Sequence, residues 1–282
     1  MAVNGHATQA FFLETESGQR FCLYHPPHAA NSVTEPAGAV IYVHPFAEEM
    51  NKSRRMAAMQ SRALAAQGYA VLQMDLFGCG DSAGDFVDAR WDSWKDDLHR
   101  AQHWLMMRSE APISVWGLRL GALLALDFAR DARSDIDKVV LWQPVVNGAQ
   151  YLTQFFRLLL ANDMITGAEQ KGGGTQDIRQ MLLAGQSLEI AGYEIAPELA
   201  AAIDKLDASA WEIPATSVHW LEGVSQASAG LSPARKKIAD TWTQKGVRLS
   251  VHTAGGPAFW TTQENVVAPE WVTATNALFQ GP

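Results

Sequence analysis

Cysteine is scarce in this sequence. Among 282 residues only Cys22 and Cys79 occur, and they lie far apart in the chain. Two such cysteines do not make a disulfide framework, and their scarcity is typical of proteins kept in a reducing compartment. The sequence therefore predicts a cytoplasmic protein.

Positive charge is also in short supply. The chain has 22 Lys and Arg residues against 30 Asp and Glu residues, which gives a formal net charge of −8, and the basic residues form no block. A surface of this sign repels the phosphates of nucleic acids and of anionic lipids. We therefore expect no nucleic-acid partner.

Patterns for membrane insertion, metals and nucleotides are missing as well. No apolar run approaches the roughly 18 residues of a membrane span, and the opening residues lack the pattern of a signal peptide. The eight histidines are scattered, and GCGDSAG (78–84) matches no phosphate-binding or dinucleotide-binding motif. The sequence predicts no membrane span, no metal site and no cofactor.

What the chain has is an alternation of strand-like and helix-like segments. Two segments, 10–15 and 20–26, favour an antiparallel pair that turns at Ser17-Gly18. Short apolar runs typical of buried parallel strands cover 39–45, 70–75, 113–117, 138–144, 216–223 and 247–253, and helical patterns cover 52–68, 93–109, 120–132 and 233–246. We expect an α/β fold with a mostly parallel sheet of about eight strands, helices on both faces, and a site at the carboxyl ends of the strands.

One segment interrupts this alternation. Residues 147–211 contain no convincing strand but hold amphipathic pieces at 150–163 and 197–207, which predicts a helical lid over the carboxyl edge of the sheet. The predicted organisation is a core of residues 1–146 and 212–279 that is divided by this lid, with 280–282 as a tail. Residues 277–282, ALFQGP, look like the remainder of a cleaved tag, so we leave them out of the predicted fold.

The stretch SVWGLRLGALLALDF (114–128) is built like a strand-turn-helix corner that carries an attacking serine in many hydrolases. Gly117 and Gly121 stand two residues to either side of the apex, where a side chain would clash with neighbouring backbone. The apex residue, however, is Arg119.

With that context the sequence resembles the α/β-hydrolase superfamily across nearly its whole length. Within it the chain is similar to the hydrolase-like proteins associated with the exosortase A system. The stretches that carry this resemblance are 43–56, 75–86, 116–125 and 255–264. The resemblance implies an α/β-hydrolase fold with a lid, an ancestral activity on acyl esters, and a role in an exosortase or exopolysaccharide locus.

The resemblance also locates the three catalytic positions of the superfamily. The nucleophile position falls on Arg119, the acid position on Glu222, and the histidine position on 253–260, where no histidine occurs and His252 is the nearest. A guanidinium stays protonated and offers no lone pair, so Arg119 is neither nucleophile nor base. A Ser-His-Asp mechanism is therefore not available at its usual place.

The same comparison places the backbone donors of an oxyanion hole. Leu120 would supply one N–H group, and Phe46 or Ala47 the other, because Pro45 has none. We expect a pocket with dipoles that attract anions to remain.

Two interpretations of Arg119 stay open. It either projects into the cleft and holds a carboxylate, phosphate or sulfate of a ligand, or it forms an internal ion pair with Glu48, Glu49, Asp75 or Glu222. Glu48 is the contact that we expect. Cys79 and Trp260 are further candidates for the wall of the site, although packing alone explains both.

The leading functional hypothesis is a triad-deficient relative that binds an acidic or acylated small molecule, or a partner protein. One alternative is an active hydrolase or acyltransferase with catalytic groups rearranged from His44, Cys79, Ser82, Glu222 and His252. For His44 a packed, hydrogen-bonded role in supporting its loop is the competing interpretation. The other alternative is a module without catalytic activity that assembles with another protein of the pathway.

Overall fold

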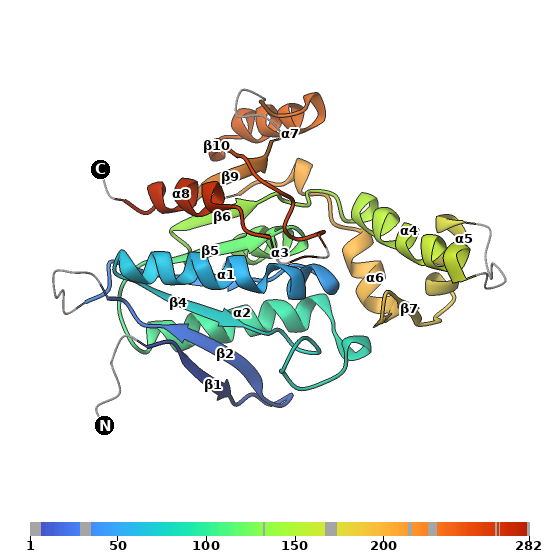
Figure 1. Cartoon of the computed structure of the whole chain (residues 1–282), viewed down its shortest axis with the longest axis horizontal. Helices are drawn as coiled ribbons and strands as arrows, with labels where there is room; N and C mark the ends of the chain where they lie inside the picture. The colour runs from blue at the N-terminus through green and yellow to red at the C-terminus, as the bar shows by residue number, and fades with distance from the viewer. Residues whose placement is uncertain are drawn as a thin grey trace.

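An eight-stranded sheet forms the centre of the computed structural model (Figure 1). The structure describes residues 7–28, 35–131, 133–166, 174–213, 216–224, 230–262, 264 and 266–280, with the backbone alone for 159–166. In spatial order the strands are β1 (Gln9–Leu13), β2 (Arg20–His25), β4 (Tyr69–Met74), β3 (Gly38–Val43), β5 (Ile113–Leu118), β6 (Lys138–Trp142), β9 (Ser217–Gly223) and β10 (Arg248–Ala254). All eight predicted strands are confirmed.

The sheet is parallel from β4 to β10, and only β1 and β2 run antiparallel to their neighbours. Every residue of β3 and of β5 is buried. Such strands carry apolar residues on both faces because helices cover both faces of a parallel sheet. The predicted fold class is therefore confirmed.

Helices of the core lie on both faces of the sheet. One face packs against α1 (Glu48–Ala66) and α8 (Pro269–Ala277), and the other against α2 (Trp91–Met106), α3 (Leu120–Ala129) and α7 (Pro233–Gln244). A short 3₁₀ turn at Phe86–Asp88 precedes α2. No helix among these ranges, or elsewhere in the described residues, is long and apolar enough to cross a bilayer.

The segment inserted between β6 and β9 gathers at the end of the molecule where the parallel strands finish (Figure 1). It contains α4 (Gly148–Thr166), α5 (Thr175–Leu183) and α6 (Pro197–Asp204), followed by a 3₁₀ turn at Ala208–Ala210. The expectation of a segment without strands is wrong, because β7 (Leu188–Ile190) and β8 (Tyr193–Ile195) form a small hairpin. Three-residue strands are too short to produce a readable alternation.

The expectation that residues 277–279 lie outside the fold is also wrong. Helix α8 reaches Ala277, and the Phe279 side chain that follows is buried and lies edge-on to Tyr69, with ring centroids 5.0 Å apart. The Tyr69 hydroxyl donates a hydrogen bond of 2.9 Å to the carbonyl of Phe279. This part of the chain therefore completes the core under α1 and α8.

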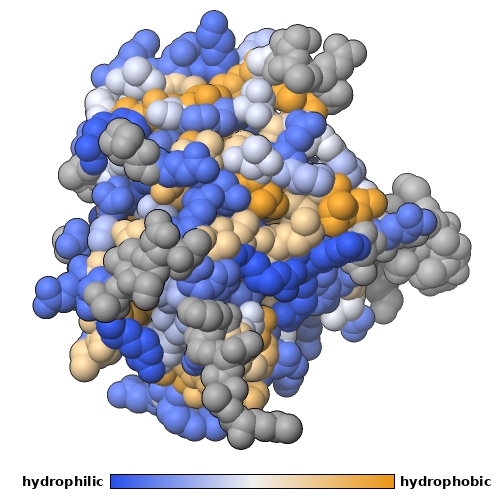
Figure 2. Space-filling model, turned by 60° about the vertical axis from the view of Figure 1, so that its left-hand side comes forward, coloured by the Kyte–Doolittle hydropathy of each residue, from blue (hydrophilic) through white to orange (hydrophobic). Residues whose placement is uncertain are grey.

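The surface is mainly hydrophilic on the side that carries the amino ends of the parallel strands. Figure 2 shows blue side chains over most of this side, with smaller orange areas between them.

Gly121 is the residue whose substitution most directly tests the packing at the start of α3. An added Cβ would collide with the carbonyl oxygens of Val43 and His44, which belong to the backbone and cannot move aside. We expect Gly121→Ala to lower the free energy of unfolding, measured in urea, by about 2 kcal/mol or more. Gly230→Ala is the control, because a Cβ there meets open space; equal stability of the two variants would contradict this packing.

Candidate functional site

The corner between β5 and α3 has the strained backbone that the sequence predicts. Arg119 adopts φ 57° and ψ −117°, a region that side chains other than glycine rarely enter. Its N–H donates to the carbonyl of Trp142 at 2.9 Å, and its carbonyl accepts from Val145 at 3.1 Å. These bonds to the β6 end of the sheet hold the apex in place and direct its side chain away from the core.

The Arg119 side chain pairs with Glu49. Its Nε donates to Glu49 Oε1 at 3.2 Å, and the two side chains are 16% and 18% exposed. The Tyr151 hydroxyl, from α4, donates to Glu49 Oε2 at 3.4 Å. The guanidinium carbon lies 5.8 Å from the Tyr151 ring centroid and 5.9 Å from that of Trp260. An ion pair and two aromatic rings thus hold the side chain.

The expected contact between Arg119 and Glu48 is wrong. Glu48 instead accepts hydrogen bonds from the Tyr193 hydroxyl and from Asn51, at 3.2 Å each. Successive residues of a helix point about 100° apart, so only one of two neighbouring glutamates at the start of α1 can face the apex. The sequence could not tell which one.

Burial dominates the electrostatics of Glu49. It raises the pKa of this carboxyl above its usual value, and Arg119 and Tyr151 counteract only part of the increase. The ion pair therefore sits where removal of the guanidinium would leave a poorly solvated carboxylate.

Glu222, at the acid position, lies at the end of β9 and is 8% exposed. Trp220 Nε1 donates to its Oε2 at 2.8 Å, and Gln143 Nε2 donates to its Oε1 at 3.2 Å. Arg235, from the first turn of α7, lies 3.4 Å from Oε1 through its Nε. This carboxylate is thus fixed by three side chains of the core.

The loop after β10, where the sequence resemblance predicts the histidine position, holds aromatic residues. Phe259 and Trp260 are buried and pack edge-on at 4.9 Å, and Trp260 packs against Trp271 at 5.6 Å. The nearest histidine, His252, lies within β10 and stacks on His219 with ring centroids 5.8 Å apart. Trp260 rather than an imidazole therefore neighbours Arg119.

The predicted oxyanion donors line a nearly closed space. Ala47 adopts φ 52° and ψ −131°, and both Ala47 and Leu120 border a cavity of about 10 Å³, which is about the room for one water molecule. Among the described residues, none accepts a hydrogen bond from the N–H groups of Phe46, Ala47 or Leu120. The donors are present, and the Phe46 ring beside them packs edge-on against Phe155 of α4, with ring centroids 5.2 Å apart.

The groups of the rearranged-enzyme alternative do not form a catalytic set. His44 Nδ1 donates to Pro45 O at 2.8 Å, and its Nε2 accepts from the Leu76 N–H at 3.2 Å, while burial lowers its pKa. Burial also raises the pKa of the Cys79 thiol. The Ser82 hydroxyl donates to the carbonyl of Asp75. The structure does not bring a nucleophile and a free imidazole together among these residues.

A cavity of about 240 Å³ opens beside Arg119, and we call it the arginine cavity. Two arginines on different elements line it, together with polar residues at the start of α4 and α7: Arg119, Arg235, Asn147, Gln150, Tyr151 and Ser232. Sequence reasoning missed Arg235 and Tyr151. The only signal for Arg235 was its place just after Pro233, which starts a helix behind the acid position.

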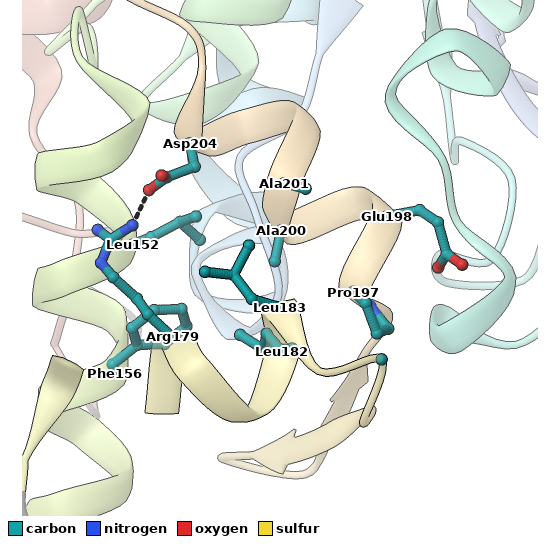
Figure 3. Close-up of a pocket in the computed structure, with 11 residues that line it drawn as sticks. Leu152, Phe156, Arg179, Leu182, Leu183, Pro197, Glu198, Ala200, Ala201 and Asp204 are labelled. Atoms are coloured by element: carbon teal, nitrogen blue, oxygen red, sulfur yellow. Dashed lines mark hydrogen bonds and ion pairs between the residues drawn. The ribbon is translucent and has the colours of Figure 1, made fainter. Parts of the chain in front are cut away.

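A second cavity of similar size lies within the inserted segment, between α4, α5 and α6 (Figure 3). Leucine and alanine side chains line most of it, and Arg179 reaches across one end to an ion pair with Asp204. Arg179 also donates to Thr153 Oγ1 at 2.9 Å, so both of these partners of the guanidinium belong to the inserted segment. This cavity is apolar and does not include Arg119.

A double-mutant cycle tests the ion pair at the apex. Arg119→Met leaves the Glu49 carboxylate buried beside Tyr151, and we expect it to lower the free energy of unfolding by about 1–3 kcal/mol. Adding Glu49→Gln removes that stranded charge and should recover much of the loss. Strictly additive losses in urea denaturation would show that the two side chains do not interact.

The stacked histidines predict a pH effect on stability. Burial, with smaller contributions from Lys138 and His252, lowers the pKa of His219 from 6.5 to about 4. Between these values only the unfolded chain binds the proton, so stability falls as the pH drops from about 6.5 to 4. His219→Gln should flatten this part of the melting temperature against pH, whereas profiles of the same slope in both proteins would argue against it.

Comparison with known proteins agrees with this architecture. The Hydrolase_4 family model, described as serine aminopeptidase, S33, matches residues 34–172. No curated protein sequence matches the chain significantly. Among solved structures, Est1E from Butyrivibrio proteoclasticus with bound ferulic acid is 15% identical, with a TM-score of 0.67 over 96% of each chain.

Two further structures are similar in the same way. A soluble variant of monoglyceride lipase from Saccharomyces cerevisiae is 11% identical, with a TM-score of 0.63 over 99% of this chain and 97% of its own. The serine hydrolase XC6422 from Xanthomonas campestris is 15% identical, with a TM-score of 0.58 over 97% and 92%. The strand order, the corner between β5 and α3, and these likenesses together show that the chain has the α/β-hydrolase fold.

Proposed function

We propose that this chain is a triad-deficient relative of the α/β-hydrolases that binds a small acidic molecule without forming a covalent bond. The observation that carries the proposal is the orientation of Arg119. Its Nε pairs with Glu49, but among the described residues none accepts a hydrogen bond from its two terminal nitrogens, and the side chain lines the arginine cavity.

The chemistry of the guanidinium supports an anionic ligand. The group is permanently charged, and two N–H groups side by side match the two oxygens of a carboxylate or phosphate. Glu49, which is itself held by Tyr151, fixes one edge of the Arg119 side chain. Because this side chain is already ordered, less conformational entropy is lost when a ligand binds to it. The arginine cavity therefore suits an acid better than the apolar cavity of the inserted segment does.

The arrangement around the apex argues against covalent catalysis. Arg119 cannot attack an ester, and the imidazole of His44 has both nitrogens engaged. The space between the oxyanion donors is about the size of one water molecule, too small for an acyl group. Binding is thus the activity that the remaining groups favour.

The cellular setting is part of the same proposal. Cys22 and Cys79 are both buried and free, which fits a protein of the cytoplasm. The sequence resemblance supports a role beside an exosortase or exopolysaccharide system. Est1E, one of the similar structures, holds ferulic acid, which is also a small acid.

Titration calorimetry at low salt tests the proposal with benzoate, phenyl sulfate and phenyl phosphate. We expect at least one of these acids to bind, and Arg119→Gln combined with Glu49→Gln to weaken that binding about tenfold or more, because a charge-assisted contact is lost. Arg130→Gln is the control, since Arg130 also pairs with a carboxylate but lies at the other end of α3.

A fluorophosphonate probe provides the complementary test, because it labels activated serine nucleophiles. The proposal predicts no label on the protein. Labelling of a serine, or acid binding that persists unchanged without Arg119, would overturn it.

A further inference from the structure

The arginine cavity holds two guanidiniums rather than one. Arg235, in the first turn of α7, lines the same cavity as Arg119, although the two residues are far apart in sequence. Burial lowers the pKa of Arg235, and the nearby charge of Arg119 lowers it further against the opposing effect of Glu222. The two positive charges are therefore close enough to repel each other.

A carboxylate balances the charge of each arginine. Glu49 pairs with Arg119 and Glu222 pairs with Arg235, but neither glutamate lines the cavity. Among the described residues of the cavity wall there is no acidic side chain. The wall that a ligand would meet is thus positive, although the chain as a whole has a net charge of −8.

Three helices also begin at this cavity. Arg119 precedes α3, Asn147 precedes α4, and Ser232 precedes α7, and all three residues line the wall. The amino end of a helix carries a partial positive charge, so it attracts anions and disfavours cations. Two arginines and three helix ends therefore bring positive charge to the wall of one cavity.

Each arginine keeps donors available for that anion. Arg235 forms an ion pair with Glu222 through Nε, and its Nη1 donates a hydrogen bond of 2.7 Å to the carbonyl of Pro144. Within the described part of the chain, nothing accepts from its Nη2 or from either terminal nitrogen of Arg119. Both arginines line one cavity of about 240 Å³, which has room for a small charged group.

We infer that the arginine cavity takes a doubly charged anionic group, a phosphate monoester, and that Arg235 determines its preference for two charges over one. This inference rests on the proposed function and names the class of acid that the site binds. The Arg119 guanidinium would bind one pair of oxygens and the Arg235 guanidinium another oxygen of the same group. A monoanion carries half the charge and would be attracted less strongly to the two guanidiniums.

Phenyl phosphate and phenyl sulfate provide the test, because they share a ring and a tetrahedral head group but differ by one charge at pH 7.5. In titration calorimetry we expect phenyl phosphate to bind at least about tenfold more tightly than phenyl sulfate. The combined variant Arg235→Gln and Glu222→Gln removes the second cation together with its partner. It should weaken phenyl phosphate about tenfold or more and leave phenyl sulfate nearly unchanged.

Arg235→Lys and Arg130→Gln complete the set. Arg235→Lys keeps the charge and should retain most of the preference, even if the combined variant fails to fold. Arg130→Gln, which removes an arginine outside the cavity, should bind both compounds as the unaltered protein does.

The outcomes separate this inference from the proposed function. If both compounds bind equally tightly through Arg119, and the combined variant Arg235→Gln and Glu222→Gln changes neither affinity, the inference is wrong while the proposed function stands. If neither these two compounds nor benzoate binds, both are wrong. If the protein prefers phenyl phosphate, and only the combined variant among the three loses this preference, the result supports both the inference and the proposed function.

Discussion

A permanently positive side chain at the sharpest corner of the fold is the constraint around which the site is arranged. Arg119 sits at positive φ immediately before α3, where a helix dipole disfavours a cation, and its guanidinium is largely buried. Burial of this charge requires a partner, and Glu49 at the start of α1 supplies it. Tyr151 then ties the inserted segment to the same carboxylate, so that one ion pair links the sheet, its covering helix and α4.

The second arginine of the cavity repeats this arrangement. Arg235 at the start of α7 pairs with Glu222 at the end of β9. Gln143 and Trp220 donate hydrogen bonds to the same carboxylate. Both arginines line the cavity, whereas neither glutamate does. Under the proposed function, a scaffold that elsewhere supports covalent attack presents two fixed cations to a ligand. The strained corner serves this role because it projects its side chain at the edge of the sheet.

Sequence patterns predicted the frame better than the details of the site. All eight strands were readable, since buried parallel strands are short apolar runs, and so were the glycines at 117 and 121 that the corner requires. The hairpin of β7 and β8 was not, because three-residue strands are too short to show an alternation, and the helix α5 was not predicted either. Glu49 rather than Glu48 as the partner of Arg119, and Arg235 as its neighbour, depend on side-chain directions and long-range packing that no local pattern encodes.

A crystal structure of the protein grown with phenyl phosphate tests the central claim most directly. The account predicts an intact, non-covalent phosphate group in the arginine cavity, with its oxygens within hydrogen-bond distance of the terminal nitrogens of Arg119 and the Glu49 pair still formed. A phosphoryl group attached to a serine or cysteine, or a ligand bound elsewhere with the Arg119 nitrogens turned toward protein carboxylates, would contradict it.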